Sequence, residues 1–272
     1  MFYKIVGLII IVTLIFILYN INNKTFFNLE NTNIIKNNEL VKNNNYKEIT
    51  SNIQQIPKII IQTWKTQQIP QRYMPLIDSV KQNNPDYQYL FFTDNDIENF
   101  FKLYYPQYLN TYLNLPIIIQ KIDFFRYVAV YHYGGFYLDL DMSIYKSFDS
   151  LLQYNCVFPV DEYLDTRFCN YSRYKDFCNN KQGFLLGQYA FAASPNHPFI
   201  KKLIDNIHNN LNKYIKYVNF DSDDYIYKTT GPDFVTKIYM NYNNKNTIKI
   251  LDIGKRQYFG EYAKHNYFGT WK

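Results

Sequence analysis

The residues that most clearly point to chemistry are two aspartates that follow a short apolar segment. Residues 135–138 read GFYL, and Asp139 and Asp141 come directly after them, separated by one leucine. If the segment is a strand, side-chain alternation places both carboxylates on the same side. Two carboxylates so close repel each other unless a cation lies between them, and hard divalent cations prefer oxygen ligands. We therefore predict a site for Mn²⁺ or Mg²⁺ that can hold a diphosphate leaving group, with a pair of exposed turn aspartates as the alternative.

Two other Asp-x-Asp triplets have simpler explanations. Asp94 and Asp96 stand where a helix is predicted to begin, and capping of that helix accounts for both. Residues 221–224 lie in a polar stretch, which we interpret as a loop with a solvated acidic patch. The position after an apolar strand, and not the triplet itself, therefore selects Asp139 and Asp141.

A second charged pair precedes the predicted strand. Asp123 and Arg126 are three residues apart, so on a helix they share a face. A surface ion pair would explain this spacing, but residues 122–130 are otherwise almost wholly apolar, which predicts a buried helix. A buried Asp/Arg pair needs polar partners, and the hydroxyls of a sugar would provide them.

The elements that position these residues alternate along the chain. Apolar or aromatic runs at 58–63, 87–92 and 136–140 predict strands, and the first is apolar enough to be a parallel strand buried on both faces. Helices are predicted at 93–104 and at 115–133, where Gly134 and Gly135 supply a stop signal. This order predicts an α/β sheet with helices on both faces, and such sheets bind ligands at the carboxyl ends of their strands.

The remaining segments divide the chain into three parts. Residues 1–19 are apolar except for Lys4 and long enough to span a bilayer, so we predict a transmembrane signal anchor. No small-residue cleavage step follows it, although a cleaved signal peptide is the alternative. Residues 20–55 are polar and predict a stem, and residues 56–272 form the expected catalytic domain.

Composition excludes several classes of protein. With 272 residues, 47% hydrophobic and 19% charged, the chain can build a large core and is not disordered. The 24 lysines are scattered and only five arginines are present, so we expect no nucleic-acid partner. Of the three cysteines, Cys169 and Cys178 can pair in an oxidising lumen and leave Cys156 free, but three ordinary thiols are an equal alternative.

Several segments together resemble a known family. Residues 123–142, DFFRYVAVYHYGGFYLDLDM, resemble the DXD-containing glycosyltransferases that include fungal α-1,6-mannosyltransferases and mannosyl-inositol-phosphorylceramide synthases. The opening strand IPKIIIQTW at 56–64, the TGP at 230–232 and the terminal HNYFGTW at 265–271 are also similar. The resemblance covers residues 56–272 and implies a GT-A-type fold, a Rossmann-related mixed sheet flanked by helices.

The resemblance assigns roles that the residues alone do not. By themselves, His265 is interpreted as an exposed loop histidine and Trp64 as a core aromatic residue. The family implies that His265 is a third metal ligand and that Trp64 lies near the nucleotide base. The family also implies that Trp271, with Lys272 beside it, closes over the diphosphate. The residues expected to bind the metal and the donor or to take part in catalysis are Trp64, Asp123, Arg126, Asp139, Asp141, Gln188, His265 and Trp271.

Three positions depart from the family pattern. Ile61 stands where a histidine is usual, Phe92 where a tryptophan is common, and Gln188 where an asparagine is frequent. The changes at Ile61 and Phe92 motivate one alternative, a catalytically inactive sugar-binding membrane protein. A further alternative is a metal-dependent nucleotide-sugar hydrolase that lacks a true acceptor. Gln188 retains an amide that can still hydrogen-bond a donor sugar.

The resulting expectation is a metal-dependent retaining hexosyltransferase. The donor is expected to be a nucleotide sugar, with GDP-mannose favoured and a UDP-hexose (galactose, glucose or N-acetylglucosamine) as the alternative, and the acceptor a glycan or glycolipid. Lys4 before the apolar segment and Lys24 after it weakly favour a single-pass type II orientation with a lumenal catalytic domain. The compartment would resemble the Golgi or endoplasmic reticulum. The excess of lysine over arginine, with abundant asparagine, isoleucine and tyrosine, suggests an AT-rich genome, and if that genome is viral the compartment would be that of a host cell.

Overall fold

The computed structural model describes residues 55–254 and 257–269. The predicted anchor, the stem up to residue 54, Trp271 and Lys272 lie outside these residues. Within the described ranges, none of the helices combines the length and the apolar character that a membrane crossing requires.

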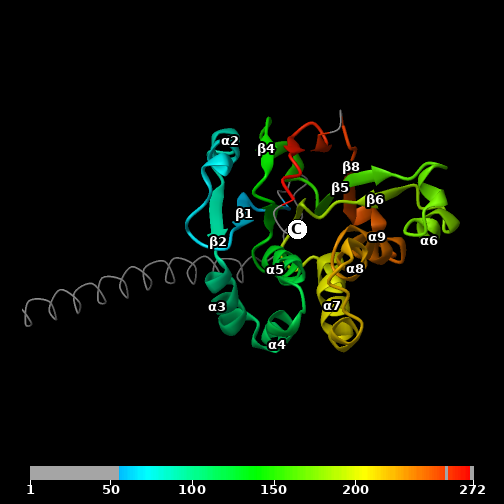
Figure 1. Ribbon diagram of the computed structural model, residues 1–272. Helices are drawn as coiled ribbons and strands as arrows, with labels where there is room; N and C mark the ends of the chain where they lie inside the picture. Colours follow the sequence, from blue (N-terminus) through cyan, green and yellow to red (C-terminus); the bar gives the residue numbers. More distant parts are fainter. Residues whose placement is uncertain (1–54, 255–256, 270–272) are drawn as a thin grey trace, which may run out of the picture. The chain divides into compact units, whose positions relative to one another are not determined.

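Strands of the described chain form two sheets (Figure 1). The larger sheet has the order β2-β1-β3-β7-β5-β6, with β8 paired to β5, and the smaller has the order β4-β10-β9. In the larger sheet β2, β1 and β3 are parallel, whereas β7 is antiparallel to both β3 and β5. The strands are β1 (Ile59–Thr63), β2 (Gln88–Phe92), β3 (Gly135–Leu138), β4 (Met142–Ile144), β5 (Cys156–Tyr163), β6 (Phe184–Leu186), β7 (Ala190–Ala193), β8 (Ile248–Leu251), β9 (Tyr258–Phe259) and β10 (Ala263–His265).

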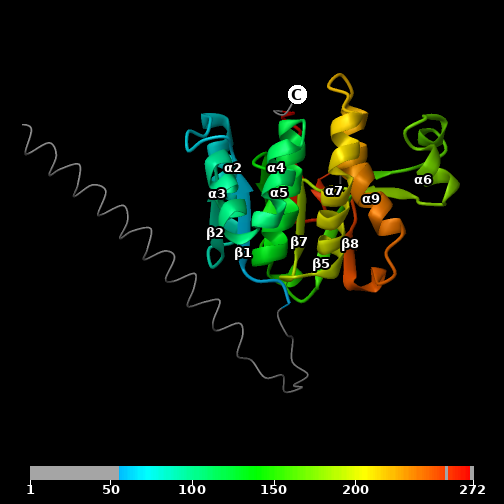
Figure 2. The same ribbon diagram turned by 90° about the horizontal axis from the view of Figure 1, so that it is seen from below.

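Helices cover one face of the larger sheet, where α3, α4, α5, α7 and α9 lie along it (Figure 2). The other face packs against α2 and the smaller sheet. Alternate side chains of β3 supply the two cores, Tyr137 to the first and Phe136 with Leu138 to the second. The α-helices are α2 (Met74–Asn83), α3 (Asp94–Tyr104), α4 (Pro106–Asn114), α5 (Ile118–Tyr133), α6 (Lys175–Asn179), α7 (Pro198–Lys216), α8 (Asp223–Thr229) and α9 (Pro232–Met240), and the 3₁₀ helices are η1 (Gln71–Tyr73), η2 (Asp149–Leu151), η3 (Phe168–Asn170) and η4 (Lys245–Thr247).

The predicted mixed α/β sheet flanked by helices is confirmed. Thr93 caps α3 in a reciprocal capping box with Asp96, as expected from the sequence. The helix before β3 ends at Gly134, whose φ of 68° is a left-handed conformation that favours glycine.

Other boundaries were predicted wrongly. The helix expected at 115–133 begins only at Ile118, because a separate helix, α4, precedes it and ends at Asn114. The strand expected at 136–140 ends at Leu138, so Asp139 lies just past the strand. Residues 221–224 are not entirely a loop, because Asp223 and Asp224 lie in the first turn of α8. Their negative charges there interact favourably with the helix dipole.

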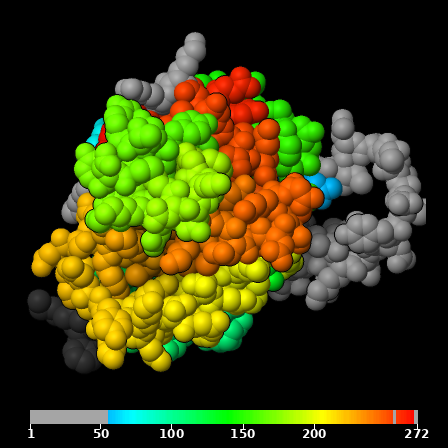
Figure 3. Space-filling model, turned by 90° about the vertical axis from the view of Figure 1, so that its right-hand side faces the viewer, coloured from blue at the N-terminus to red at the C-terminus, as the bar shows by residue number. Residues whose placement is uncertain are grey.

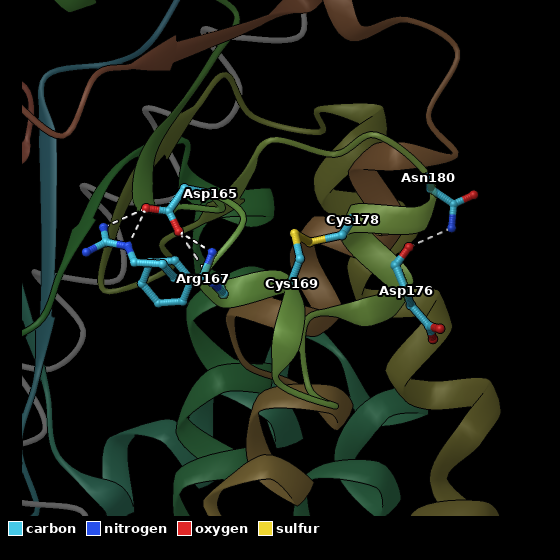
Figure 4. The surroundings of a disulfide bond; sticks show 7 residues. Asp165, Arg167, Cys169, Asp176, Cys178 and Asn180 are labelled. Atoms are coloured by element: carbon cyan, nitrogen blue, oxygen red, sulfur yellow. Dashed lines mark hydrogen bonds and ion pairs between the residues drawn. A yellow bond between two sulfur atoms is a disulfide. The ribbon is translucent and has the colours of Figure 1, made fainter.

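Between β5 and β6 the chain leaves the sheet at residues 164–183, a segment called here the excursion, which contains α6. Cys169 and Cys178 form a disulfide that closes it (Figure 4), so the open alternative of three free thiols is excluded. Cys156 is free and buried. Space-filling atoms of the excursion, in green, lie against those of residues around 205–240 (Figure 3).

Candidate active site

Asp139 is held by its backbone at the end of β3. Its N–H donates to the carbonyl of Tyr189 (2.7 Å), and its own carbonyl accepts from Nε2 of Gln62 on β1 (3.2 Å). The hydroxyl of Tyr89 in turn donates to Oε1 of Gln62 (2.8 Å). Backbone hydrogen bonds to Tyr189 and Gln62, the latter held by Tyr89, therefore fix the position of Asp139. They do not use its side chain, which can face the site.

Asp141 and His265 are brought together by the smaller sheet. β4 and β10 are antiparallel, with His265 opposite Met142, and His265 Nε2 lies 3.2 Å from Oδ1 of Asp141. The N–H of Phe268 donates to Oδ2 of Asp141 (2.9 Å), and the N–H of Asn266 donates to its carbonyl (3.0 Å). The interpretation of His265 as an exposed loop histidine was wrong, because it ends a strand and its side chain is only 11% exposed.

Asp139, Asp141 and His265 form a group that fits a divalent cation. One ligand atom from each residue lies within 4.8 Å of the others. The imidazole contacts the rings of Tyr189 (4.3 Å) and Tyr267 (4.0 Å), and its buried Nδ1 has no hydrogen-bond partner among the described residues. Carboxylate oxygens suit Mg²⁺ and Mn²⁺, whereas imidazole favours a transition metal, so the set fits Mn²⁺ best.

The electrostatics of the two aspartates differ. Burial raises the pKa of Asp139, with Arg126 opposing this effect and the negative charge of Asp141 adding to it. Burial also tends to raise the pKa of Asp141, but hydrogen bonds from His265 and from the N–H of Phe268 outweigh it and hold the pKa below its usual value. A cation between the carboxylates would remove their mutual repulsion.

A buried polar cluster lies beside the metal-binding group. Asp123 and Arg126 of α5 form an ion pair of 3.1 Å with side chains only 1% and 2% exposed, as the sequence predicted. Oδ1 of Asp123 accepts from Nε2 of Gln188 (3.1 Å), and Oδ2 accepts from Oγ1 of Thr230 (2.7 Å). Burial raises the pKa of Asp123 to about 6, although Arg126 and Thr230 oppose the shift. Both oxygens of this carboxylate are therefore engaged inside the protein.

Arg126 connects this cluster to the metal-binding group. Its Nη2 lies 3.3 Å from Oδ1 of Asp139, and its Nη1 donates to the carbonyl (2.9 Å) and Oε1 (3.1 Å) of Gln188. The guanidinium also lies 4.6 Å from the ring centre of Tyr137. One cation thus contacts two carboxylates and the glutamine, which fixes their relative positions.

All described residues that the sequence analysis selected for the site line one cavity of about 560 Å³. It lies at the carboxyl ends of the central strands, where ligands of α/β sheets bind. These residues are Trp64, Asp123, Arg126, Asp139, Asp141, Gln188 and His265. Trp271 lies outside the described residues.

One end of this cavity is aromatic. Trp64 follows β1, and its ring contacts that of Tyr73 at 5.0 Å between centroids. Tyr73 in turn meets Phe268 edge-on at 5.5 Å, and the guanidinium of Arg72 lies 5.2 Å from the centre of the Phe268 ring. Of these residues, Trp64 and Tyr73 line the cavity, and an aromatic ring such as that of Trp64 offers a surface on which a nucleotide base can stack.

Sequence analysis gave no site role to four charged residues of the cavity wall, Lys65, Asp94, Asp161 and Arg173. Burial raises the pKa of Asp161 to about 6, with His265 and Arg173 opposing it. Arg173 lies on the excursion and forms a two-point ion pair with Asp233. An acidic residue late in the apolar run of β5 was a signal for Asp161, but no local pattern marks Arg173.

The two unusual residues of the sheet lie away from the cavity. Ile61 is fully buried in the core under α5, and Phe92 packs against Phe100 and Phe125. Neither belongs to the cavity wall. Their departure from the family pattern therefore changes packing and not the groups that face a ligand.

Comparison with known proteins gives a consistent result. Residues 70–158 match the glycosyltransferase sugar-binding region containing the DXD motif. The chain is 32% identical to inositol phosphoceramide mannosyltransferase 3 of Schizosaccharomyces pombe over 68% of this chain and 45% of that protein. It is 30% identical to mannosyl phosphorylinositol ceramide synthase CSH1 of Saccharomyces cerevisiae over 70% of this chain and 44% of that protein. The chain thus spans about half the length of these curated relatives.

The fold is also similar to that of a solved structure. The PaToxG glycosyltransferase superposes with a TM-score of 0.50 at 18% identity, over 70% of this chain and 71% of that one. At this identity the likeness concerns the fold alone, and it agrees with the mixed, parallel-rich sheet described above.

Proposed function

The chain belongs to the glycosyltransferase family whose sugar-binding region contains the DXD motif, and from this premise we propose that it transfers a hexose from a nucleotide sugar to a glycan or glycolipid. The observation that carries the proposal is the convergence of two carboxylates and an imidazole in a cavity that also holds the buried Asp123–Arg126 pair.

Asp139, Asp141 and His265 are proposed to hold Mn²⁺, or Mg²⁺ as the alternative. When bound, the ion would neutralise the diphosphate of the departing nucleotide. Trp64 would contact the base, and its ring contact with Tyr73 supports this role. Trp271 is proposed to close over the diphosphate, as the family resemblance implies.

Asp123, Arg126 and Gln188 are proposed to orient the donor sugar. Because both oxygens of Asp123 already accept hydrogen bonds, this carboxylate is poorly placed to form a covalent bond to the sugar. The family resemblance implies retention of the anomeric configuration. Without a covalent nucleophile, retention would proceed by front-face displacement, in which the acceptor attacks from the side on which the leaving group departs. The amide of Gln188 would orient the sugar beside the reacting carbon.

Mannose from GDP-mannose is the favoured donor, because the relatives are named as mannosyltransferases and mannosyl-lipid synthases. A UDP-hexose is the alternative within the same fold. Those names also favour a phosphoinositol-containing lipid as the acceptor class.

We further propose that residues 1–19 anchor the chain in a membrane as a type II protein and that the catalytic domain faces the lumen of a secretory compartment. The Cys169–Cys178 disulfide supports this proposal, because disulfides persist in oxidising compartments and are rare in the cytosol.

A donor panel tests the proposed activity. The full-length chain is incubated with Mn²⁺ and GDP-mannose, UDP-galactose, UDP-glucose or UDP-N-acetylglucosamine, with and without acceptors. We expect transfer, with retention seen in the NMR spectrum of the product. Acceptor-independent hydrolysis would favour a hydrolase, and binding without turnover a sugar-binding protein.

The Asp141→Asn variant tests whether the transfer in this assay depends on the proposed metal ligand. Asparagine keeps an oxygen that can accept from the N–H of Phe268, so the fold should persist. Mn²⁺-dependent transfer should fall at least about 100-fold, since a ligand charge is lost. Near-normal activity of this variant would contradict the metal assignment.

A further inference from the structure

A second cavity, of about 640 Å³, lies between the excursion and α7, α8 and α9. Its volume falls within the range typical of small-molecule sites, roughly 300–1,000 Å³. The donor-site residues proposed above do not line it.

The charge of this cavity favours an anion. Four cationic side chains line it against two carboxylates, those of Asp176 and Asp233. Arg173 is paired with Asp233 at 2.6 Å, and Lys228 with Asp224 of the same helix at 3.1 Å. Among the residues that the structure describes, the remaining cations, Lys213 and Lys237, form no ion pair. Among these residues the carboxylate of Asp176 forms no ion pair either, so the two ammonium groups outweigh one carboxylate, and a concave surface with this positive balance attracts a negatively charged ligand.

Aromatic rings complement these charges. Tyr214, Tyr217, Tyr225 and Phe177 line the same cavity. The hydroxyl of Tyr225 donates to the carbonyl of Tyr214 (2.7 Å), which joins α8 to α7 at the cavity wall. Flat rings beside ammonium groups suit a ligand that combines a sugar-like ring with a phosphate.

The second cavity adjoins the donor cavity. Arg173 lines both, and it is held in place by Asp233 and by the ring of Tyr227, 4.2 Å from its guanidinium. Gly231 lines the donor cavity, and Thr229, two residues earlier, lines the second. Residues two apart lie within about 7 Å of each other, so the two cavities share a wall at Arg173 and at residues 229–231.

The elements around the second cavity also expose apolar side chains. Ile215, Tyr217 and Phe220 at the end of α7 and after it are exposed, as is Tyr171 of the excursion. Aromatic residues next to lysines are typical of surfaces that meet the interface of an anionic membrane. This combination favours a ligand presented by a lipid.

We propose that the second cavity binds the phosphate-bearing headgroup of a lipid acceptor, with Lys213 and Lys237 facing the phosphate. The headgroup ring would lie against the tyrosines and pass Arg173 so that its hydroxyl reaches the donor cavity. This inference rests on the proposed function, because it locates the headgroup of the proposed acceptor in the second cavity.

The test compares a charged with a neutral acceptor, using the full-length chain in detergent with Mn²⁺ and the donor. Lysophosphatidylinositol carries the phosphate, and an alkyl mannoside does not. In the double variant Lys213→Glu/Lys237→Glu, we expect the KM for lysophosphatidylinositol to rise about 10-fold or more. The KM values for the mannoside and the donor should stay the same.

Lys216→Glu is the matched control, because Lys216 is an exposed lysine of α7 that does not line the cavity. It should leave all three KM values unchanged. Equal changes for both acceptors in the double variant, or no change for either, would overturn the headgroup assignment.

Direct binding separates this inference from the proposed activity. If the wild type transfers to no acceptor, the proposed function fails, but titration calorimetry with glycerophosphoinositol still examines the cavity. A Kd about 10-fold higher in the double variant supports the inference, and equal or absent binding overturns it. Inorganic phosphate that binds as tightly as glycerophosphoinositol would show selection of a free anion and would likewise overturn it.

Discussion

Arg126 shows how single residues organise the donor cavity. Its guanidinium contacts Asp123 on one side and Asp139 on the other, so the polar cluster and the metal-binding group share one buried cation. The sequence predicted the Asp123–Arg126 pair and the Asp139/Asp141 pair, because the members of each pair are close together in the chain. It did not predict the bridge between them, because Asp139 reaches Arg126 only after β3 has packed beside α5. Arg173 was missed for the same reason, since its partner Asp233 is 60 residues away.

His265→Ala tests the third metal ligand. If the imidazole coordinates Mn²⁺, its loss should weaken Mn²⁺ affinity by about 10- to 100-fold, on the scale known for residues that support metal ligands. The measurement is transfer activity as a function of Mn²⁺ concentration in the wild type and the variant. His208→Ala, which removes an imidazole bonded to Thr111 far along α7, provides the control and should leave the titration unchanged. Superimposable curves for the wild type and His265→Ala would remove His265 from the site.

Local signals explain which elements could be predicted. The strands at 59–63 and 88–92, the Thr93 cap and the glycine stop of α5 each depend on a few adjacent residues. The antiparallel strand β7 between β3 and β5 was not predicted, because its pairing depends on residues far apart in the chain. α4 was not predicted, and α5 begins later than the predicted start at Leu115, because Leu115 precedes Pro116 and is not helical.

Gly135→Ala tests the junction that delivers Asp139 to the site. Gly135 has a φ of 84°, and an added Cβ would collide with the carbonyl oxygen of Ile59 on β1. We expect a loss of about 2 kcal/mol or more in the free energy of unfolding, measured by urea denaturation. Gly183→Ala is the control, because no atom lies within 4 Å of its added Cβ, and it should change stability by less than about 0.5 kcal/mol. Equal stability of the two variants would show that the junction tolerates a side chain.

His197, the N-cap of α7, makes stability depend on pH. Its ring accepts from the N–H of Phe199, and burial lowers its pKa to about 4. Between pH 6.5 and 4 the unfolded chain binds a proton there that the folded chain does not, so stability present above pH 6.5 is lost as the pH falls. Asparagine is a favoured N-cap that does not titrate. In His197→Asn the Tm should therefore fall less between pH 7 and pH 5 than in the wild type, and equal slopes would contradict this assignment.

On the scale of the whole described domain, the parallel and antiparallel parts of the larger sheet hold different residues of the proposed site. Among the parallel strands β2, β1 and β3, Trp64 follows β1 and Asp139 follows β3. On the antiparallel side, Asp161 lies in β5 and Gln188 shortly precedes β7. The first group faces the proposed nucleotide, and the second includes Gln188, which is proposed to orient the donor sugar. Arg126 and Arg173 lie where these two sides meet, so the reaction would occur at the boundary between a parallel and an antiparallel part of one sheet.

Removing residues 1–51 tests whether the anchor and stem contribute to this domain. Among the described residues, Gln55 and Ile56 donate their N–H groups to the carbonyl of Leu152, and the side chain of Ile56 is fully buried. The fragment 52–272 retains these contacts, so it should be soluble, melt cooperatively by circular dichroism and keep transfer activity within about threefold on a soluble acceptor. The fragment 58–272 loses Ile56 and should melt at a lower temperature, because burial of an isoleucine side chain contributes about 2 kcal/mol. A fragment 52–272 that melts cooperatively but transfers no sugar to the soluble acceptor would show that residues 1–51 supply part of the site, since loss of the proposed anchor should remove only the proposed attachment to the membrane.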